Sequence, residues 1–146
     1  MIAIDTNLLI YAHRKDVPWH ATAIATVRSL WESAEPWMIP WPCIHEFYGI
    51  VTNTKIYRPA SSSDAAMNQI DEWLESDTVV IGTETTTHWP VLRGLITQGR
   101  IIGPMVHDAK IAAICSQHGV SVLYTADRDF NRFPDLKCVN PLLKSK

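Results

Sequence analysis

The chain has few cysteines, few glycines and no long hydrophobic run. Its three cysteines, Cys43, Cys115 and Cys138, are odd in number and form no C-x-x-C pair, which argues against a zinc site and against a disulfide framework. The longest apolar stretches are far shorter than a membrane span, and the N-terminus lacks the basic region of a signal peptide. We therefore expect a cytoplasmic protein, not bound to a membrane, with reduced and largely buried thiols.

The composition that remains is typical of a globular domain. The 146 residues are 47% hydrophobic and 19% charged, which is enough for a hydrophobic core, so we expect a single domain over residues 1–146. The formal net charge of −2 argues weakly against nucleic-acid binding. If four of the 15 acids belong to a metal site, the remaining acids are fewer than the 13 lysines and arginines, and the rest of the surface is slightly basic.

Hydrophobic periodicity predicts strands and helices in alternation. The predicted strands are short apolar segments at 2–4, 37–39, 79–81, 120–124 and 138–139. Helices are predicted over 8–12, 20–33, from 42, from about 64, from 85 or 89 to 98, and over 106–118, with Gly99 and Gly119 as the stops of the last two. This alternation predicts an α/β fold in which helices cover both faces of a mostly parallel sheet.

Acidic residues follow two of these strands. Asp5 comes directly after the first strand, and Asp127 follows the strand 120–124, so both are expected at the sheet edge where ligand crevices form. Asp108 lies in the first turn of the helix that leads into the second of these strands, which brings it towards the same edge. Clustered carboxylates repel one another unless a cation neutralises them. Oxygen ligands without matching histidines or cysteines favour Mg²⁺, or Mn²⁺, over Zn²⁺, and such sites hydrolyse phosphodiesters.

The ordered set of motifs resembles the PIN domain, and most closely the VapC toxins of bacterial toxin–antitoxin modules. The motifs are Asp5-Thr6-Asn7, Glu46 on an early helix, His107-Asp108-Ala109-x-Ile111-Ala112-Ala113, and Thr125-Ala126-Asp127-Arg128-Asp129-Phe130. The resemblance covers essentially the whole chain. It implies a PIN-like three-layer α/β/α sandwich and a Mg²⁺-dependent endoribonuclease, whose metal ligands and catalytic acids are Asp5, Glu46, Asp108 and Asp127.

Further residues are expected to support this quartet. Asn7 and Thr125 could orient the carboxylates, or make the hydrogen bonds of a helix start and a strand end. Asp127 is expected to face the metal, and Asp129 to fix its loop through a hydrogen bond to the backbone, and the reverse assignment of these two acids stays open. The sequence does not decide whether Glu46 or Asp127 positions the attacking water. Lys110 and Arg128, the cations nearest to the acids in the sequence, are the expected contacts to RNA phosphates.

The resemblance also implies partners, and two other functions stay open. The expected partners are single-stranded or looped RNA, a second copy of the chain, and a small VapB-type antitoxin. An exposed patch of Trp19, Trp37 and Trp41, which stand among prolines, could receive that antitoxin. One alternative is a non-catalytic PIN-like protein that binds RNA or a partner, although all four acids are present. The other is a phosphatase of the haloacid dehalogenase type, which needs a second acid where this chain has Asn7.

Overall fold

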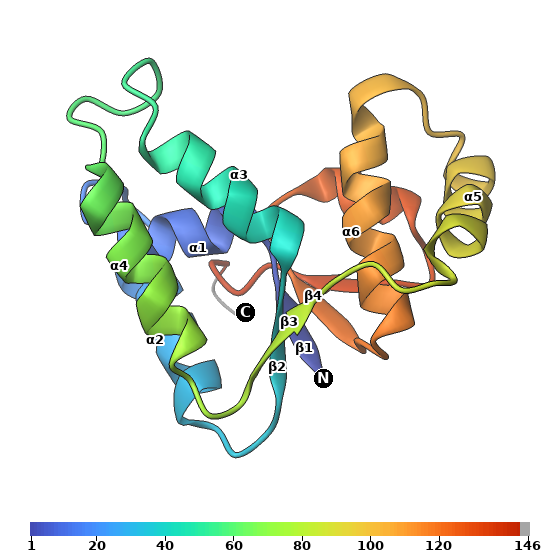
Figure 1. Ribbon diagram of the computed structural model, residues 1–146, viewed down its shortest axis with the longest axis horizontal. Coiled ribbons are helices and arrows are strands. Elements are labelled where there is room, and N and C mark those ends of the chain that lie inside the picture. Colours follow the sequence, from blue (N-terminus) through green and yellow to red (C-terminus); the bar gives the residue numbers. More distant parts are fainter. Residues whose placement is uncertain (144–146) are drawn as a thin grey trace.

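A parallel β-sheet forms the centre of the molecule (Figure 1). The computed structural model describes residues 1–143. Its strands are β1 (Ile2–Ile4), β2 (Trp37–Pro40), β3 (Val79–Gly82), β4 (Val122–Tyr124) and β5 (Lys137–Val139), in the order β3-β2-β1-β4-β5. Every neighbouring pair in this sheet is parallel. The predicted α/β class is therefore confirmed.

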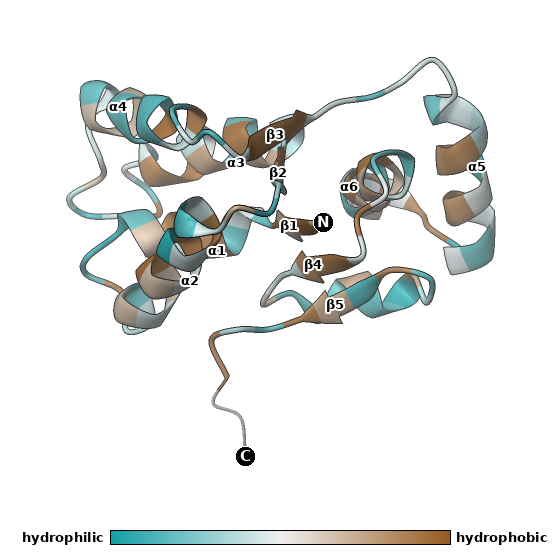
Figure 2. Cartoon of the chain, turned by 90° about the horizontal axis from the view of Figure 1, so that it is seen from below, coloured by the Kyte–Doolittle hydropathy of each residue, from teal (hydrophilic) through white to brown (hydrophobic). Residues whose placement is uncertain are grey.

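Helices cover the sheet on both sides, as the alternating pattern predicts (Figures 1 and 2). One layer contains α1 (Thr6–His13), α2 (His20–Glu32), α3 (Trp41–Val51) and α4 (Ser63–Leu74), and the other contains α5 (His88–Gly99) and α6 (Val106–Gln117). Short 3₁₀ segments, η1 (Gly103–Met105) and η2 (Arg128–Arg132), precede α6 and β5. In the part of the chain that the structure describes, no helix is long and apolar enough to cross a membrane.

The strand order reverses between β1 and β4. The chain first proceeds outwards from β1 through β2 to β3, and then returns to add β4 on the other side of β1. In parallel sheets a crevice opens at the carboxyl ends of the strands on either side of such a reversal. The reversal therefore fixes where a ligand site is expected, beyond Ile4 and Tyr124.

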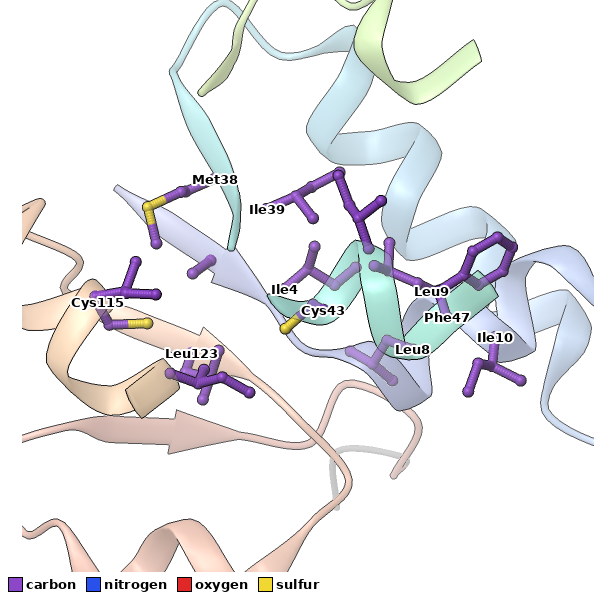
Figure 3. Close-up of a cluster of buried hydrophobic side chains, with 14 of the residues drawn as sticks. Ile4, Leu8, Leu9, Ile10, Met38, Ile39, Cys43, Phe47, Cys115 and Leu123 are labelled. Atoms are coloured by element: carbon purple, nitrogen blue, oxygen red, sulfur yellow. The ribbon is translucent and has the colours of Figure 1, made fainter. Parts of the chain in front are cut away.

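The core lies between the sheet and both helical layers (Figure 3). Met38 and Ile39 of β2 are fully buried, as are Leu8 and Leu9 of α1. On the other face, α6 approaches the sheet closely because small side chains occupy its buried positions, namely Ala109, Ala112 and Ala113. Cys43 and Cys115 are buried, as was expected of these thiols.

Gly82, the last residue of β3, allows this close packing. A Cβ atom at position 82 would lie 2.5 Å from Sδ of Met38 and 2.9 Å from Cγ2 of Ile114 on α6. Any larger residue would have to displace one of these buried side chains, which costs stability in a close-packed interior.

The end of α5 differs from the prediction, whereas the end of α6 agrees with it. Gly99 is the last residue of α5, and the left-handed conformation falls on Arg100, with φ 50°. A Cβ at Gly99 would lie 3.3 Å from the carbonyl oxygen of Arg132, so this glycine serves close packing against η2. Gly119 has φ +69° directly after the cap of α6, which is the conformation expected of a helix stop.

A buried arginine ties the loop between α3 and α4 to the end of α1. Arg14 is 8% exposed, and its Nη2 donates to Oδ2 of Asp16 at 2.6 Å and to the carbonyl oxygen of Pro59 at 2.8 Å. The guanidinium carbon also lies 4.2 Å from the centre of the Tyr57 ring. Arg14 is thus held by an ion pair, a backbone acceptor and an aromatic face.

Candidate active site

Asp5 lies between β1 and α1, at the carboxyl end of β1, where the strand order reverses. Its N–H donates to the carbonyl oxygen of Tyr124 at 2.9 Å, which continues the pairing of β1 with β4. Its Oδ1 accepts from the backbone N–H of Thr6 at 2.7 Å and from the Cys43 thiol at 3.7 Å. Its Oδ2 accepts from the Thr125 hydroxyl at 2.7 Å. Since all these partners donate, they match the ionised carboxylate, which only accepts.

Burial and neighbouring acids nevertheless disfavour the charge on Asp5. The residue is 5% exposed, and this burial raises the pKa of its carboxyl group. The hydrogen bonds from Thr125 and Thr6 lower this pKa, while the negative charges of Glu46 and Asp127 raise it further. A positive charge at this place would stabilise the ionised form.

Thr6 connects Asp5 to Glu46 on α3. Its hydroxyl donates to Oε2 of Glu46 at 2.8 Å, while its N–H donates to Asp5 as described above. The bond to Glu46 could not be predicted from the sequence, because it depends on how α3 packs against α1. The only signal in the sequence is the place of Thr6 directly after Asp5.

Three further carboxylates gather beyond the end of β4. Asp108, Asp127 and Asp129 each offer an oxygen, and these three atoms lie within 4.8 Å of one another. Asp108 comes from the first turn of α6, where the helix dipole favours a negative charge. Burial, followed by the charges of Asp127 and Asp5, still raises the pKa of Asp108 to about 6.

The hydrogen bond that was expected of Asp129 is made by Asp127. Oδ1 of Asp127 accepts from the N–H of Asp129 at 2.9 Å, because Asp127 occupies the capping position of η2 and Asp129 lies in its first turn. Asp127 therefore fixes the loop and also faces the other acids. The carboxylate of Asp129 also lies among these acids.

Asn7 and Thr125 hold the two strand ends together. Oδ1 of Asn7 accepts from the N–H of Ala126 at 3.3 Å. The Thr125 hydroxyl, which donates to Asp5, also accepts from the N–H of Asp127 at 3.0 Å. Thr125 thereby links the acid after β1 to the acid after β4, whereas Asn7 bonds to the backbone after β4.

The two cations that are expected to contact RNA phosphates differ in their exposure. Arg128 is exposed, between Asp127 and Asp129 in the sequence, whereas Lys110 is half-buried on α6.

Trp37 is 1% exposed, so the expected exposed patch is wrong for this residue. Strand β2 is covered on both faces, and the Nε1–H of Trp37 donates to the Ser76 hydroxyl at 3.2 Å.

The fold and the site define the class of this protein. It is an α/β protein whose carboxylates gather where the strand order reverses, an arrangement suited to bind a cation. A family model, the PIN domain, matches residues 2–136, and the chain belongs to this family. Ribonuclease VapC43 of Mycobacterium tuberculosis is 30% identical over 142 residues, which cover 97% of this chain and 96% of the relative. Ribonuclease VapC31 of the same species is 28% identical over 143 residues, 98% of this chain and 100% of the relative.

Solved structures share the fold at lower sequence identity. VapBC2 of Rickettsia felis, bound to a DNA fragment from its promoter, has a TM-score of 0.70 at 20% identity and covers 96% of this chain and 98% of its own. VapC20 of Mycobacterium tuberculosis, described as a toxin that cleaves the sarcin–ricin loop, has a TM-score of 0.67 at 17% identity and covers 90% and 93%. The predicted resemblance and the PIN-like three-layer fold are confirmed.

Proposed function

We propose that this protein is a metal-dependent endoribonuclease and the toxin of a VapBC-type toxin–antitoxin module. The observation that carries the proposal is the gathering of acids from β1, α3, α6 and the end of β4 at one edge of the sheet. The ribonuclease names of the relatives support the reaction. In a non-catalytic PIN-like protein, nothing would require these charges to face one another.

The residues at this edge fit a hard divalent cation, Mg²⁺ or Mn²⁺. Asp5, Glu46, Asp108 and Asp127 would hold it, and Asp129 lies close enough to assist. Their donors are oxygens, and the nearby Cys43 remains protonated because burial raises the pKa of its thiol well above the ordinary value. When bound, such a cation supplies Lewis acidity, which lowers the pKa of water and offsets negative charge on a phosphodiester.

The side chains of this chain position the reacting groups. Thr125 and Thr6 fix Asp5 and Glu46 in one orientation through their hydroxyl groups. Glu46 and Asp127 each have one oxygen, Oε1 and Oδ2 respectively, outside the hydrogen bonds described above. Either of the two can therefore accept the proton of the attacking water. Lys110 and Arg128 would bind phosphates of the RNA on either side.

Single-stranded or looped RNA is the proposed substrate, because its phosphates are accessible to an open sheet edge. A small VapB-type antitoxin is the proposed inhibitor, since similar structures include the VapBC-1 complex of nontypeable Haemophilus influenzae and VapBC2 of Rickettsia felis. We also propose that the toxin forms a homodimer, as the family resemblance implies.

Cleavage of structured RNAs by the purified protein tests the proposal. Three conditions are compared, namely Mg²⁺, EDTA, and Mg²⁺ with the Asp5→Asn variant. The matched control is Asp77→Asn, which changes an exposed acid two residues before β3, at the amino end of the sheet. Wild type and Asp77→Asn should cleave RNA in Mg²⁺, and cleavage should be lost in EDTA and in Asp5→Asn. Cleavage that resists EDTA, or full activity of Asp5→Asn, would falsify the proposal.

A further inference from the structure

A groove of about 400 Å³ lies between α3 and α6. Its walls are Trp41 and His45 of α3, Lys110 and Ile114 of α6, and Thr83 and Glu84 directly after β3. The same two helices carry Glu46 and Asp108, each within two residues of a groove residue in the sequence. Because Thr83 follows the carboxyl end of β3 in a parallel sheet, the groove shares its sheet edge with the acids.

Trp41 gives this groove an accessible aromatic face. The indole is 38% exposed and stacks on the imidazole of His45, with ring centres 6.0 Å apart and planes inclined by 17°. Pro40 and Pro42 flank Trp41 at the start of α3, which restricts the backbone there. An exposed aromatic ring on a rigid element loses little conformational entropy when it binds another flat ring.

Lys110 adds a positive charge to the same groove. It is half-buried on α6, two residues after Asp108. An aromatic face beside an ammonium group is the combination that binds single-stranded nucleic acids, in which bases stack on aromatic rings and phosphates meet cations.

We propose that this groove is a nucleobase subsite, in which a base next to the cleaved phosphodiester stacks on Trp41 while Lys110 binds a neighbouring phosphate. The inference rests on the proposed function for the identity of the substrate as RNA. The stacking itself requires neither the metal nor cleavage, because it depends only on the face of the base. It is tolerant of sequence, since every base has such a face.

Binding of two RNA pools by fluorescence anisotropy tests the subsite. One pool contains short single strands of random sequence, and the other contains the same sugar–phosphate strands without bases, both in Ca²⁺. Trp41→Ala should weaken binding of the base-containing pool about 10- to 100-fold and leave binding of the abasic pool unchanged. Trp41→Phe should retain most of the affinity. Lys110→Gln should weaken binding of both pools and reduce the dependence on salt.

Trp89→Ala is the matched control, because Trp89 is 61% exposed at the start of α5 and does not line the groove. Its affinities should equal those of wild type. Unchanged affinity of Trp41→Ala for base-containing RNA overturns the subsite and leaves the exposed ring to a protein partner. An equal loss for both pools also overturns it. Cleavage in Mg²⁺ is measured separately, so absent cleavage with base-dependent binding contradicts the proposed function and not the subsite.

Discussion

The Thr125 hydroxyl donates to the buried carboxylate of Asp5, and its removal should be costly. In Thr125→Val, Oδ2 of a buried carboxylate loses a donor at 2.7 Å, and the N–H of Asp127 loses its acceptor at 3.0 Å. A hydrogen bond to a charged group contributes about 1.5–3 kcal/mol and a neutral one about 1 kcal/mol. The expected loss in the free energy of unfolding is therefore about 2.5–4 kcal/mol in EDTA near neutral pH, which lowers Tm by roughly 5–15 °C.

Thr125→Ser is the matched control, because it keeps the hydroxyl group. Urea unfolding of both variants and of wild type, followed by circular dichroism, measures the difference. Burial raises the pKa of Asp5, and the Thr125 hydrogen bond opposes part of this rise. Loss of the bond in Thr125→Val raises this pKa further, so the bond stabilises the protein most at a pH where Asp5 is ionised. The difference between the two variants should therefore shrink as the pH falls and Asp5 becomes protonated. Equal stability of Thr125→Val and Thr125→Ser near neutral pH would refute this account of Asp5.

Three other changes have defined outcomes. Because the pKa of Asp108 rises from 3.8 to about 6 on folding, this carboxyl group destabilises the metal-free protein as the pH rises through that window. Asp108→Asn should therefore raise Tm at about pH 7.5 in EDTA and not at about pH 4. An equal gain in Tm at the two pH values would contradict the raised pKa of Asp108. Gly82→Ala should lower the free energy of unfolding by about 1–3 kcal/mol through overpacking. Gly94→Ala, in open space on α5, should raise it by up to about 1 kcal/mol. The reverse order of stabilities in urea unfolding would disprove the packing argument. Arg14→Ala should cost about 2–4 kcal/mol through its lost charged contacts, whereas Arg28→Ala, at an exposed position, should stay within about 0.5 kcal/mol. Similar losses for the two arginine variants would exclude the proposed role of Arg14.

The placement of Asp5 and Asp127 followed from the sequence because it depends on local pattern and topology. Short apolar segments directly before each acid predict strands, and alternation with helices predicts that the strands are parallel. These two inferences suffice to place both acids at one sheet edge. The position of Asp108 could be predicted in the same way. A helix that leads into a strand of a parallel sheet must begin near the carboxyl end of that strand.

Other features depend on tertiary packing and could not be predicted from local pattern. The bond from Thr6 to Glu46 requires α3 to lie against α1, which no local signal specifies. Trp37 stands near prolines that suggested an exposed patch, yet its strand is covered on both faces. Gly99 was expected in the left-handed conformation, but its lack of a side chain serves the contact with Arg132.

We propose above all that a divalent cation binds at the carboxyl edge of the sheet, among Asp5, Glu46, Asp108 and Asp127. Anomalous diffraction from crystals grown with Mn²⁺ tests this most directly, because the anomalous signal of this ion distinguishes it from protein atoms and water. The account predicts a peak in contact with carboxylate oxygens of Asp108 and Asp127, and no peak there in crystals of Asp108→Asn. A well-ordered crystal with Mn²⁺ bound elsewhere and none among these acids would contradict it.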